Sequence, residues 1–147
     1  MESDPCRFQG KVKVLCTVPS LDTPVCDTET RRFNKEAAAL PDKFVVLTIS
    51  MDLPFAQGRW CGAVGIDRVK TLSDYQDRSV ATAYGVLIRE FKLLAREVFV
   101  VDEADIIRYI QLVKEVTVEP DYEAVLGAVK ALACYTRSGK KSRKISH

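Results

Sequence analysis

The segment FVVLTIS at 44–50 is an almost continuous apolar run, and it constrains the fold more than any other part of the sequence. A strand of that composition is typical of a sheet covered on both faces. The segment KVKVLCTV at 11–18 alternates and is rich in valine, which predicts a second strand. Between them, Phe33, Ala37 and Leu40 recur at helical spacing and predict an amphipathic helix. The chain therefore opens with strand, helix and strand.

The rest of the sequence adds shorter elements to this beginning. Pro19 ends the first strand, Pro24 suits the first helical position, and Thr23 is a candidate N-cap. This order predicts an α/β fold, a central sheet with helices on its faces that is compatible with a thioredoxin-like arrangement. The expected strands are 11–18, 44–50, 69–72, 98–101 and 106–113, and the expected helices are 25–40, 52–65, 78–84 and 121–133.

Length and charge narrow the class of protein. The chain has 147 residues, about the length of one domain. Its 22 Lys and Arg residues nearly balance 20 Asp and Glu residues, which argues against a nucleic-acid-binding protein. No apolar run approaches the roughly 20 residues that cross a bilayer, and MESDPCRFQG lacks signal-peptide character. We expect no membrane association, a cytoplasmic location, one domain at 10–134 and a basic, disordered tail at 135–147.

The five cysteines raise the question of reactivity, because an odd number cannot pair completely within one chain. None forms a C-x-x-C pair, and the only histidine is His147, the last residue. A zinc site needs three or four closely spaced soft ligands, so no metal site is expected. A reactive cysteine here needs something other than histidine to stabilise its thiolate. The cysteines are Cys6, Cys16, Cys26, Cys61 and Cys134.

Cys26 is the best candidate nucleophile by position, since it lies in the first turn of the predicted helix. Unpaired N–H groups and the helix dipole favour an anion there, and the Thr23 hydroxyl could lie beside the sulfur. The alternative is a small buried residue that fills space. Core packing is the corresponding alternative for Cys61 and the expectation for Cys16. The two cysteines near the chain ends are interpreted as incidental.

Four blocks of the sequence resemble the thiol peroxidase branch of the peroxiredoxins, the atypical two-cysteine members of that family. In the first block, Pro19, Thr23 and Cys26 match the pattern P-x-x-x-T-x-x-C. The resemblance follows the family's order over about Gly10–Leu132 and implies a thioredoxin-like fold with a mixed sheet. The blocks are VPSLDTPVCDTETRRFN at 18–34, ISMDLPFAQGRWCGAVGI at 49–66, YGVLIREFKLLAREVFVVD at 84–102 and EVTVEPDYEAVLGAVKAL at 115–132.

The resemblance implies an antioxidant activity, the reduction of hydrogen peroxide and organic hydroperoxides. Cys26 corresponds to the peroxidatic cysteine, whose thiolate becomes a sulfenic acid. Arg96 corresponds to the family's arginine, which favours the thiolate and binds the peroxide oxygens; without the resemblance it would be interpreted as a surface charge. Thr23 would position the peroxide, and Pro19 would shape the loop. The N–H groups of Val25 and Cys26 would bind the developing anion.

Cys61 resembles the family's resolving cysteine, which attacks the sulfenic acid and forms an intramolecular disulfide with Cys26. A disulfide needs Cα atoms within about 7 Å, so we expect one or both helical segments to unwind during each cycle. Gly58, Gly62 and Gly65 make the second segment pliable. The resemblance further implies reduction by thioredoxin, a homodimer, and chemistry without metal, haem, flavin or other cofactor.

The sequence also departs from the family pattern. Family members begin with a further hairpin and strand, which MESDPCRFQ does not resemble, so we expect this hairpin region to be missing and apolar surface to be exposed. The turn at Ala104–Asp105 lacks the family's glycine. Three hypotheses follow: an active peroxidase, an impaired remnant that dimerises or binds partners, and a thiol-exchanging binding module. The first is favoured by the retention of Thr23, Cys26, Cys61 and Arg96.

Overall fold

The elements of the fold begin in the predicted order of strand, helix and strand. The computed structural model describes residues 10–40, 43–115 and 117–132. The strands are β1 (Val12–Thr17), β2 (Phe44–Ser50), β3 (Val69–Ser73), β4 (Leu87–Ile88), β5 (Leu93–Leu94), β6 (Glu97–Val101) and β7 (Ile107–Leu112). The helices are α1 (Pro24–Ala37), α2 (Pro54–Val64), α3 (Ser79–Ala83) and a last helix at 122–132.

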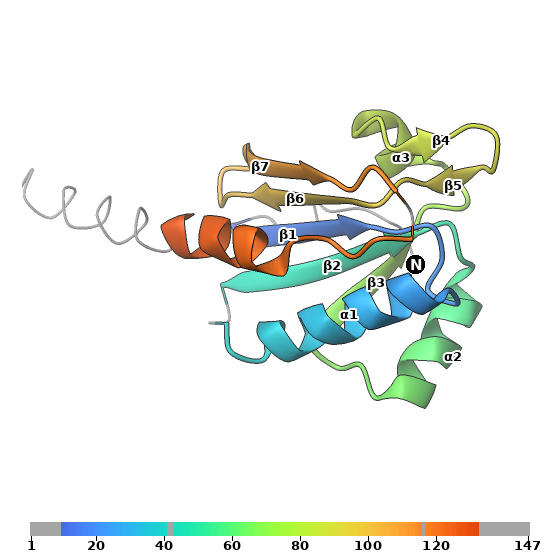
Figure 1. Cartoon of the computed structure of the whole chain (residues 1–147), viewed down its shortest axis with the longest axis horizontal. Coiled ribbons are helices and arrows are strands. Elements are labelled where there is room, and N and C mark those ends of the chain that lie inside the picture. The colour runs from blue at the N-terminus through green and yellow to red at the C-terminus, as the bar shows by residue number, and fades with distance from the viewer. Residues whose placement is uncertain (1–9, 41–42, 116, 133–147) are drawn as a thin grey trace, which may run out of the picture.

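Strand β1 is the centre of a mixed sheet with the order β3-β2-β1-β6-β7. It pairs in parallel with β2, which pairs in parallel with β3, whereas β6 is antiparallel to both β1 and β7. The two parallel connections pass through α1 and α2, because parallel neighbours cannot be joined by a tight turn. Figure 1 shows α1 and the orange helix at 122–132 on the same side of this sheet. The predicted α/β fold with a central mixed sheet is confirmed.

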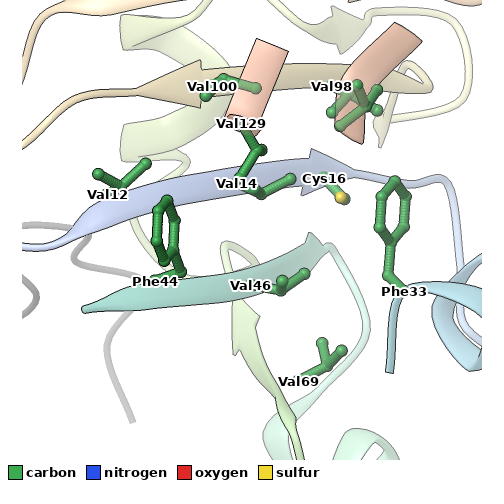
Figure 2. Close-up of a cluster of buried hydrophobic side chains, with 11 residues drawn as sticks. Val12, Val14, Cys16, Phe33, Phe44, Val46, Val69, Val98, Val100 and Val129 are labelled. Carbon is green, nitrogen blue, oxygen red and sulfur yellow. The ribbon is translucent and has the colours of Figure 1, made fainter. Parts of the chain in front are cut away.

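The alternating side chains of β1 supply two separate cores. Val12, Val14 and Cys16 belong to one core, together with Phe33 of α1 and Val129 of the last helix. Figure 2 shows these strand side chains with Phe33 and Val129 around them. Each large apolar side chain buried in this way stabilises the fold by about 1.5–3 kcal/mol. The apolar stripe of α1 therefore fixes the helix, and with it Cys26, against the sheet.

The opposite face of the sheet has its own core, built on Leu15, Leu47 and Phe99. Helix α3 and the small β4–β5 hairpin contribute Val80 and Leu94 to this cluster. The sequence predicts α3 but not the hairpin, because strands of two residues are too short to show alternation. The hairpin also positions Arg96, because β5 leads through Ala95 to Arg96, the residue that precedes β6.

Strands β6 and β7 form the predicted hairpin, although its turn has no glycine. Asp105 adopts the left-handed conformation, with φ of 62°, that glycine commonly provides. Asp and Asn tolerate this region because their short polar side chains hydrogen-bond locally. The Asp105 carboxylate accepts a hydrogen bond of 2.5 Å from the buried side chain of Lys13 on β1. The departure from the family pattern is thus accommodated by an aspartate.

Strand β7 lies at one edge of the sheet and carries exposed apolar side chains. Ile107, Ile110 and Leu112 are 41%, 55% and 57% exposed. An edge strand with such side chains favours pairing with another chain.

Some predicted boundaries differ from the observed ones. Helix α1 ends at Ala37 rather than at residue 40, because the chain tightens there: the N–H groups of Ala39 and Leu40 bond carbonyls three residues back. The tail predicted at 135–147 lies outside the described residues. Within the described ranges, no helix has both the length and the apolar character to cross a membrane.

Candidate active site

Cys26 lies in the first turn of α1, after a loop in which Pro19 is buried. Thr23 occupies the N-cap position and Pro24 begins the helix, as the sequence predicts. The Thr23 side chain makes no cap hydrogen bond, however, and its hydroxyl donates to the Ser20 carbonyl at 2.7 Å. Among the described residues, this hydroxyl has no hydrogen bond to Cys26. Its partner lies in the loop instead.

A carboxylate beyond the end of β2 fixes this loop. Asp52 accepts a hydrogen bond from the Ser20 hydroxyl at 2.7 Å and another from the Leu21 N–H at 2.8 Å. The Ser50 hydroxyl donates to the same carboxylate at 2.7 Å. Because β1 and β2 are parallel neighbours, their carboxyl ends meet at one edge of the sheet, where ligand sites of α/β folds commonly lie. Asp52 therefore ties the Cys26 loop to that edge.

Arg96 reaches Cys26 because of the strand register. Arg96 precedes β6, and Glu97 at the start of β6 pairs with Thr17 at the end of β1. The Arg96 carbonyl accepts a hydrogen bond of 3.1 Å from the Val113 N–H, which fixes its backbone. The side chain is 1% exposed, and its Nη2 lies 3.3 Å from Cys26 Sγ. The interpretation of Arg96 as a surface charge is therefore wrong.

Glu29 completes a buried charged cluster, and sequence reasoning did not identify it. It follows Cys26 by three residues, so one turn of α1 places both side chains on the same face. The side chain is fully buried, and its Oε2 accepts a hydrogen bond from Arg96 Nη1. An acidic residue one helical turn after the candidate thiol is the signal that could have revealed it. We call Cys26, Arg96 and Glu29 the charged cluster.

Burial and charge shift the pKa values in the charged cluster. Burial raises the pKa of Glu29 to about 7, although the positive charge of Arg96 opposes this shift. Burial lowers the pKa of Arg96, but the Glu29 carboxylate and Cys26 more than compensate, so that this pKa lies above its usual value. Arg96 therefore remains a cation beside the sulfur.

Apolar side chains surround the sulfur on other sides. Cys26 is fully buried with Val18 and Leu21, and Trp60 of α2 packs against this group. The indole N–H of Trp60 donates to the Asp27 carboxylate at 3.0 Å, which ties α2 to α1. Exclusion of water strengthens the electrostatic interaction between Arg96 and the thiol.

Cys61 lies on α2, in less constrained surroundings. It is half-buried, and its Sγ lies 3.6 Å from the hydroxyl of Thr71 on β3. Gln57 is buried on the same helix, and its amide donates to a β3 carbonyl at 2.8 Å. Cys26 and Cys61 are both free thiols. The structure therefore brings Arg96 to Cys26, whereas Cys61 contacts β3.

A cleft of about 680 Å³ opens beside the Ser20 loop and α2. Its wall includes Leu21 and Trp60, the same side chains that pack against Cys26. Arg59 and the highly exposed Phe55 also line it. The cleft therefore reaches the side chains that cover the sulfur.

Of the three remaining cysteines, the structure describes one, Cys16. Cys16 is fully buried in the core, as expected, and burial raises the pKa of its thiol well above the usual value. Cys6 and Cys134 lie outside the described residues. Over the described ranges, no group of three or more His, Cys, Asp or Glu side chains could hold a metal ion.

Similarity to known proteins shows the family to which this chain belongs. The family model described as Redoxin matches residues 3–126, so the chain belongs to the redoxin family. The thiol peroxidase of Streptococcus pneumoniae is 57% identical over 125 residues, which cover 85% of this chain and 76% of that protein. The thiol peroxidase of Bacillus subtilis is 56% identical over 125 residues, which cover 85% of this chain and 74% of that protein.

A solved structure agrees with these relatives. The peroxiredoxin-like protein from Aquifex aeolicus has a TM-score of 0.80 and 46% identity, and the match covers 84% of this chain and 73% of that one. Within the redoxins, the chain thus falls among the bacterial thiol peroxidases, and the predicted thioredoxin-like peroxiredoxin fold is confirmed. Its activity is that of a peroxiredoxin-type peroxidase.

Proposed function

We propose that this chain reduces hydrogen peroxide and organic hydroperoxides through Cys26, with Cys61 as the resolving thiol. The observation that carries the proposal is the 3.3 Å contact between Arg96 Nη2 and Cys26 Sγ inside a buried site. A guanidinium at this distance favours the thiolate over the thiol. Its five N–H donors also suit it to bind peroxide oxygens. This arrangement meets the need for an activator other than histidine.

In the first step, the Cys26 thiolate attacks the terminal peroxide oxygen and the O–O bond breaks. The sulfur is oxidised to a sulfenic acid, and the leaving oxygen takes a proton to become water or an alcohol. Helix geometry leaves the N–H groups of Val25 and Cys26 without intrahelical partners, which suits them to the developing negative charge. Thr23 and Pro19 shape the loop on which the peroxide is held.

In the second step, the Cys61 thiolate attacks the sulfenic sulfur, water leaves, and a disulfide forms. Successive residues of a helix point about 100° apart, and here Trp60 packs with the Cys26 group while Cys61 contacts β3. Bond formation therefore requires α2 to turn or unwind. Gly58 and Gly62 lower the cost of this change because glycine stabilises a helix poorly.

An external dithiol then restores both thiols, and we propose that it is thioredoxin. Two thiol–disulfide exchanges transfer the oxidation to the partner and return Cys26 and Cys61 to the reduced state. The relatives named thiol peroxidases support a thiol reductant of this kind. A homodimer and a cytoplasmic location stay predictions from the sequence.

The peroxidase step is tested with reduced protein, cumene hydroperoxide and mass spectrometry of the cysteine peptides. We expect wild type to form a disulfide between Cys26 and Cys61, and Cys61→Ser to stop at the sulfenic or over-oxidised Cys26. Cys26→Ser should consume no peroxide above background. Cys16→Ala is the matched control, because it removes a core thiol and should retain turnover. If Cys26→Ser consumes peroxide as fast as wild type, the proposal is wrong.

The reductant is tested separately by following NADPH oxidation. Thioredoxin with thioredoxin reductase should support continuous turnover of wild type, and Cys61→Ser should lose it. Glutathione with glutathione reductase is the control. Turnover that is equal with both systems would contradict the choice of thioredoxin and leave the peroxidase step intact.

A further inference from the structure

We infer that Glu29 competes with Cys26 for the positive charge of Arg96, so that ionisation of either group opposes ionisation of the other. The geometry is direct: Arg96 Nη1 donates to Glu29 Oε2 and Nη2 donates to Cys26 Sγ at 3.3 Å. One cation therefore serves two acidic groups. The inference rests on Cys26 being the reacting thiol of the proposed function.

The count of charges explains the competition. With one acid ionised, the charged cluster is neutral, because the single positive charge of Arg96 is balanced. With both acids ionised, the cluster carries an excess negative charge in a site where Arg96 is 1% and Glu29 0% exposed. Such a charge is costly where water is excluded. Two acids coupled in this way lose their protons in two separate steps that belong to the pair.

The surroundings of the Glu29 carboxyl group allow both its protonated and its ionised form. Its second carboxylate oxygen, Oε1, is buried without a hydrogen-bond partner among the described residues. An unpartnered oxygen is less costly on a neutral carboxyl than on a carboxylate. The pKa of Glu29, raised by burial to about 7, agrees with this geometry.

Other ionisable groups lie near Glu29, but its ion-pair partner among the described residues is Arg96. Glu119 adds negative charge and raises the pKa of Glu29 further. Burial raises the pKa values of Tyr122 on the last helix and Cys16 on β1, and the negative charge of Glu29 raises both further. Arg32 of α1 lies 4.9 Å from the centre of the Tyr122 ring and pairs with Glu36 and Glu123.

The test consists of two titrations without peroxide, so its failure is distinct from failure of the proposed function. The first measures the rate at which iodoacetamide alkylates Cys26 between pH 4 and 10, in wild type and Glu29→Gln, by mass spectrometry of the Cys26 peptide. The second follows the Glu29 carboxyl carbon by NMR over the same range, in reduced wild type and Cys26→Ser. Both use the full chain.

Because the first group to ionise does so at its own midpoint, the competition appears in the group that ionises second. We expect one of the two titration curves to move to lower pH by about one unit when the other acid is removed. The proposal is overturned if neither curve moves, or if either moves to higher pH. A purely structural role of Glu29 would lower rates without moving a curve.

Two variants complete the design. Glu36→Gln is the matched control, because Glu36 lies on the same helix and pairs with Arg32 at 2.9 Å, and its alkylation curve should coincide with that of wild type. A thermal melt checks that Glu29→Gln is folded. If it is not, Glu29→Met supplies a second neutral side chain of similar length for the same measurement.

Discussion

The two thiols of the proposed cycle lie in very different surroundings. Cys26 is fully buried at the start of a helix of 14 residues and touches a buried cation. Cys61 is half-buried on a helix of 11 residues, all of them described, in which only Gln57 is buried. A guanidinium lies beside the first sulfur, whereas a hydroxyl lies beside the second. The difference is compatible with the proposed cycle, in which Cys26 reacts with the peroxide and Cys61 moves toward it.

The largest expected effect comes from breaking the charged cluster. Arg96→Lys keeps the positive charge but has no planar fork to contact Glu29 and Cys26 together. We expect the rate of Cys26 oxidation by peroxide to fall by about 100-fold or more, as when one essential donor is lost from an active site. Stopped-flow kinetics measure this rate. Arg31→Lys, at an exposed position on α1, should retain the wild-type rate; equal losses in both variants would contradict the prediction.

The next effect concerns stability and pH. The pKa of Glu29 is raised from 4.5 to about 7 on folding, so the folded state binds the proton more tightly than the unfolded state. Its contribution to stability is therefore present below pH 4.5 and is lost as the pH rises toward 7. The free energy of unfolding of wild type, relative to Glu29→Gln, should fall by up to about 3 kcal/mol across this range. Urea titrations at each pH measure this free energy. A difference between wild type and Glu29→Gln that does not change with pH would contradict the raised pKa of Glu29.

A smaller effect tests whether α2 must unwind before Cys61 can reach Cys26. An added Cβ at Gly58 or Gly62 meets no atom within 4 Å, so alanine fits at both positions. Each replacement should stabilise the helix by roughly 0.5–1 kcal/mol. If α2 must unwind, the double variant should form the disulfide about tenfold more slowly while Cys26 is oxidised at the wild-type rate. Rapid acid quench and mass spectrometry separate the two steps. Gly127→Ala, in the last helix, is the control and should change neither.

The smallest effect concerns the tie between the two regions. Asp27→Ala removes the acceptor of the Trp60 indole N–H, a hydrogen bond worth about 0.5–1.5 kcal/mol. We expect disulfide formation to become about two- to fivefold faster, because α2 is released more easily. Asp27→Asn is the matched control, since it retains an acceptor for the indole and loses the charge that pairs with Arg31. The prediction fails if both variants behave alike.

Much of this fold can be predicted from local pattern. The periodicity of two in β1 and of 3.6 in α1 identifies both elements, and the family blocks predict Cys26 as the reacting thiol. The position of Arg96 depends on the register between β6 and β1, which no local pattern contains. Glu29 is overlooked because acidic residues on helices are usually solvated, and its buried ion-pair partner Arg96 lies 67 residues further along the chain, just before β6.

Details of the loop are also beyond sequence reasoning. The hydroxyl of Thr23 has both the loop carbonyl of Ser20 and the helix as potential partners, and the folded loop decides between them. Asp52 lies in the family block at 49–66, but its contact with the Ser20 loop arises only because two parallel strands end side by side. Such contacts arise from topology rather than from neighbouring residues.

Trp60 gives the protein an intrinsic fluorescence that can be followed without an added label. It is the only tryptophan of the chain, it precedes Cys61, and its ring packs against the group that contains Cys26. Fluorescence from an indole responds to solvent and to hydrogen bonding, and here both depend on whether α2 is docked. The intrinsic emission of the protein should therefore change with each oxidation and reduction, so that an ordinary fluorimeter can follow single turnovers in the native chain.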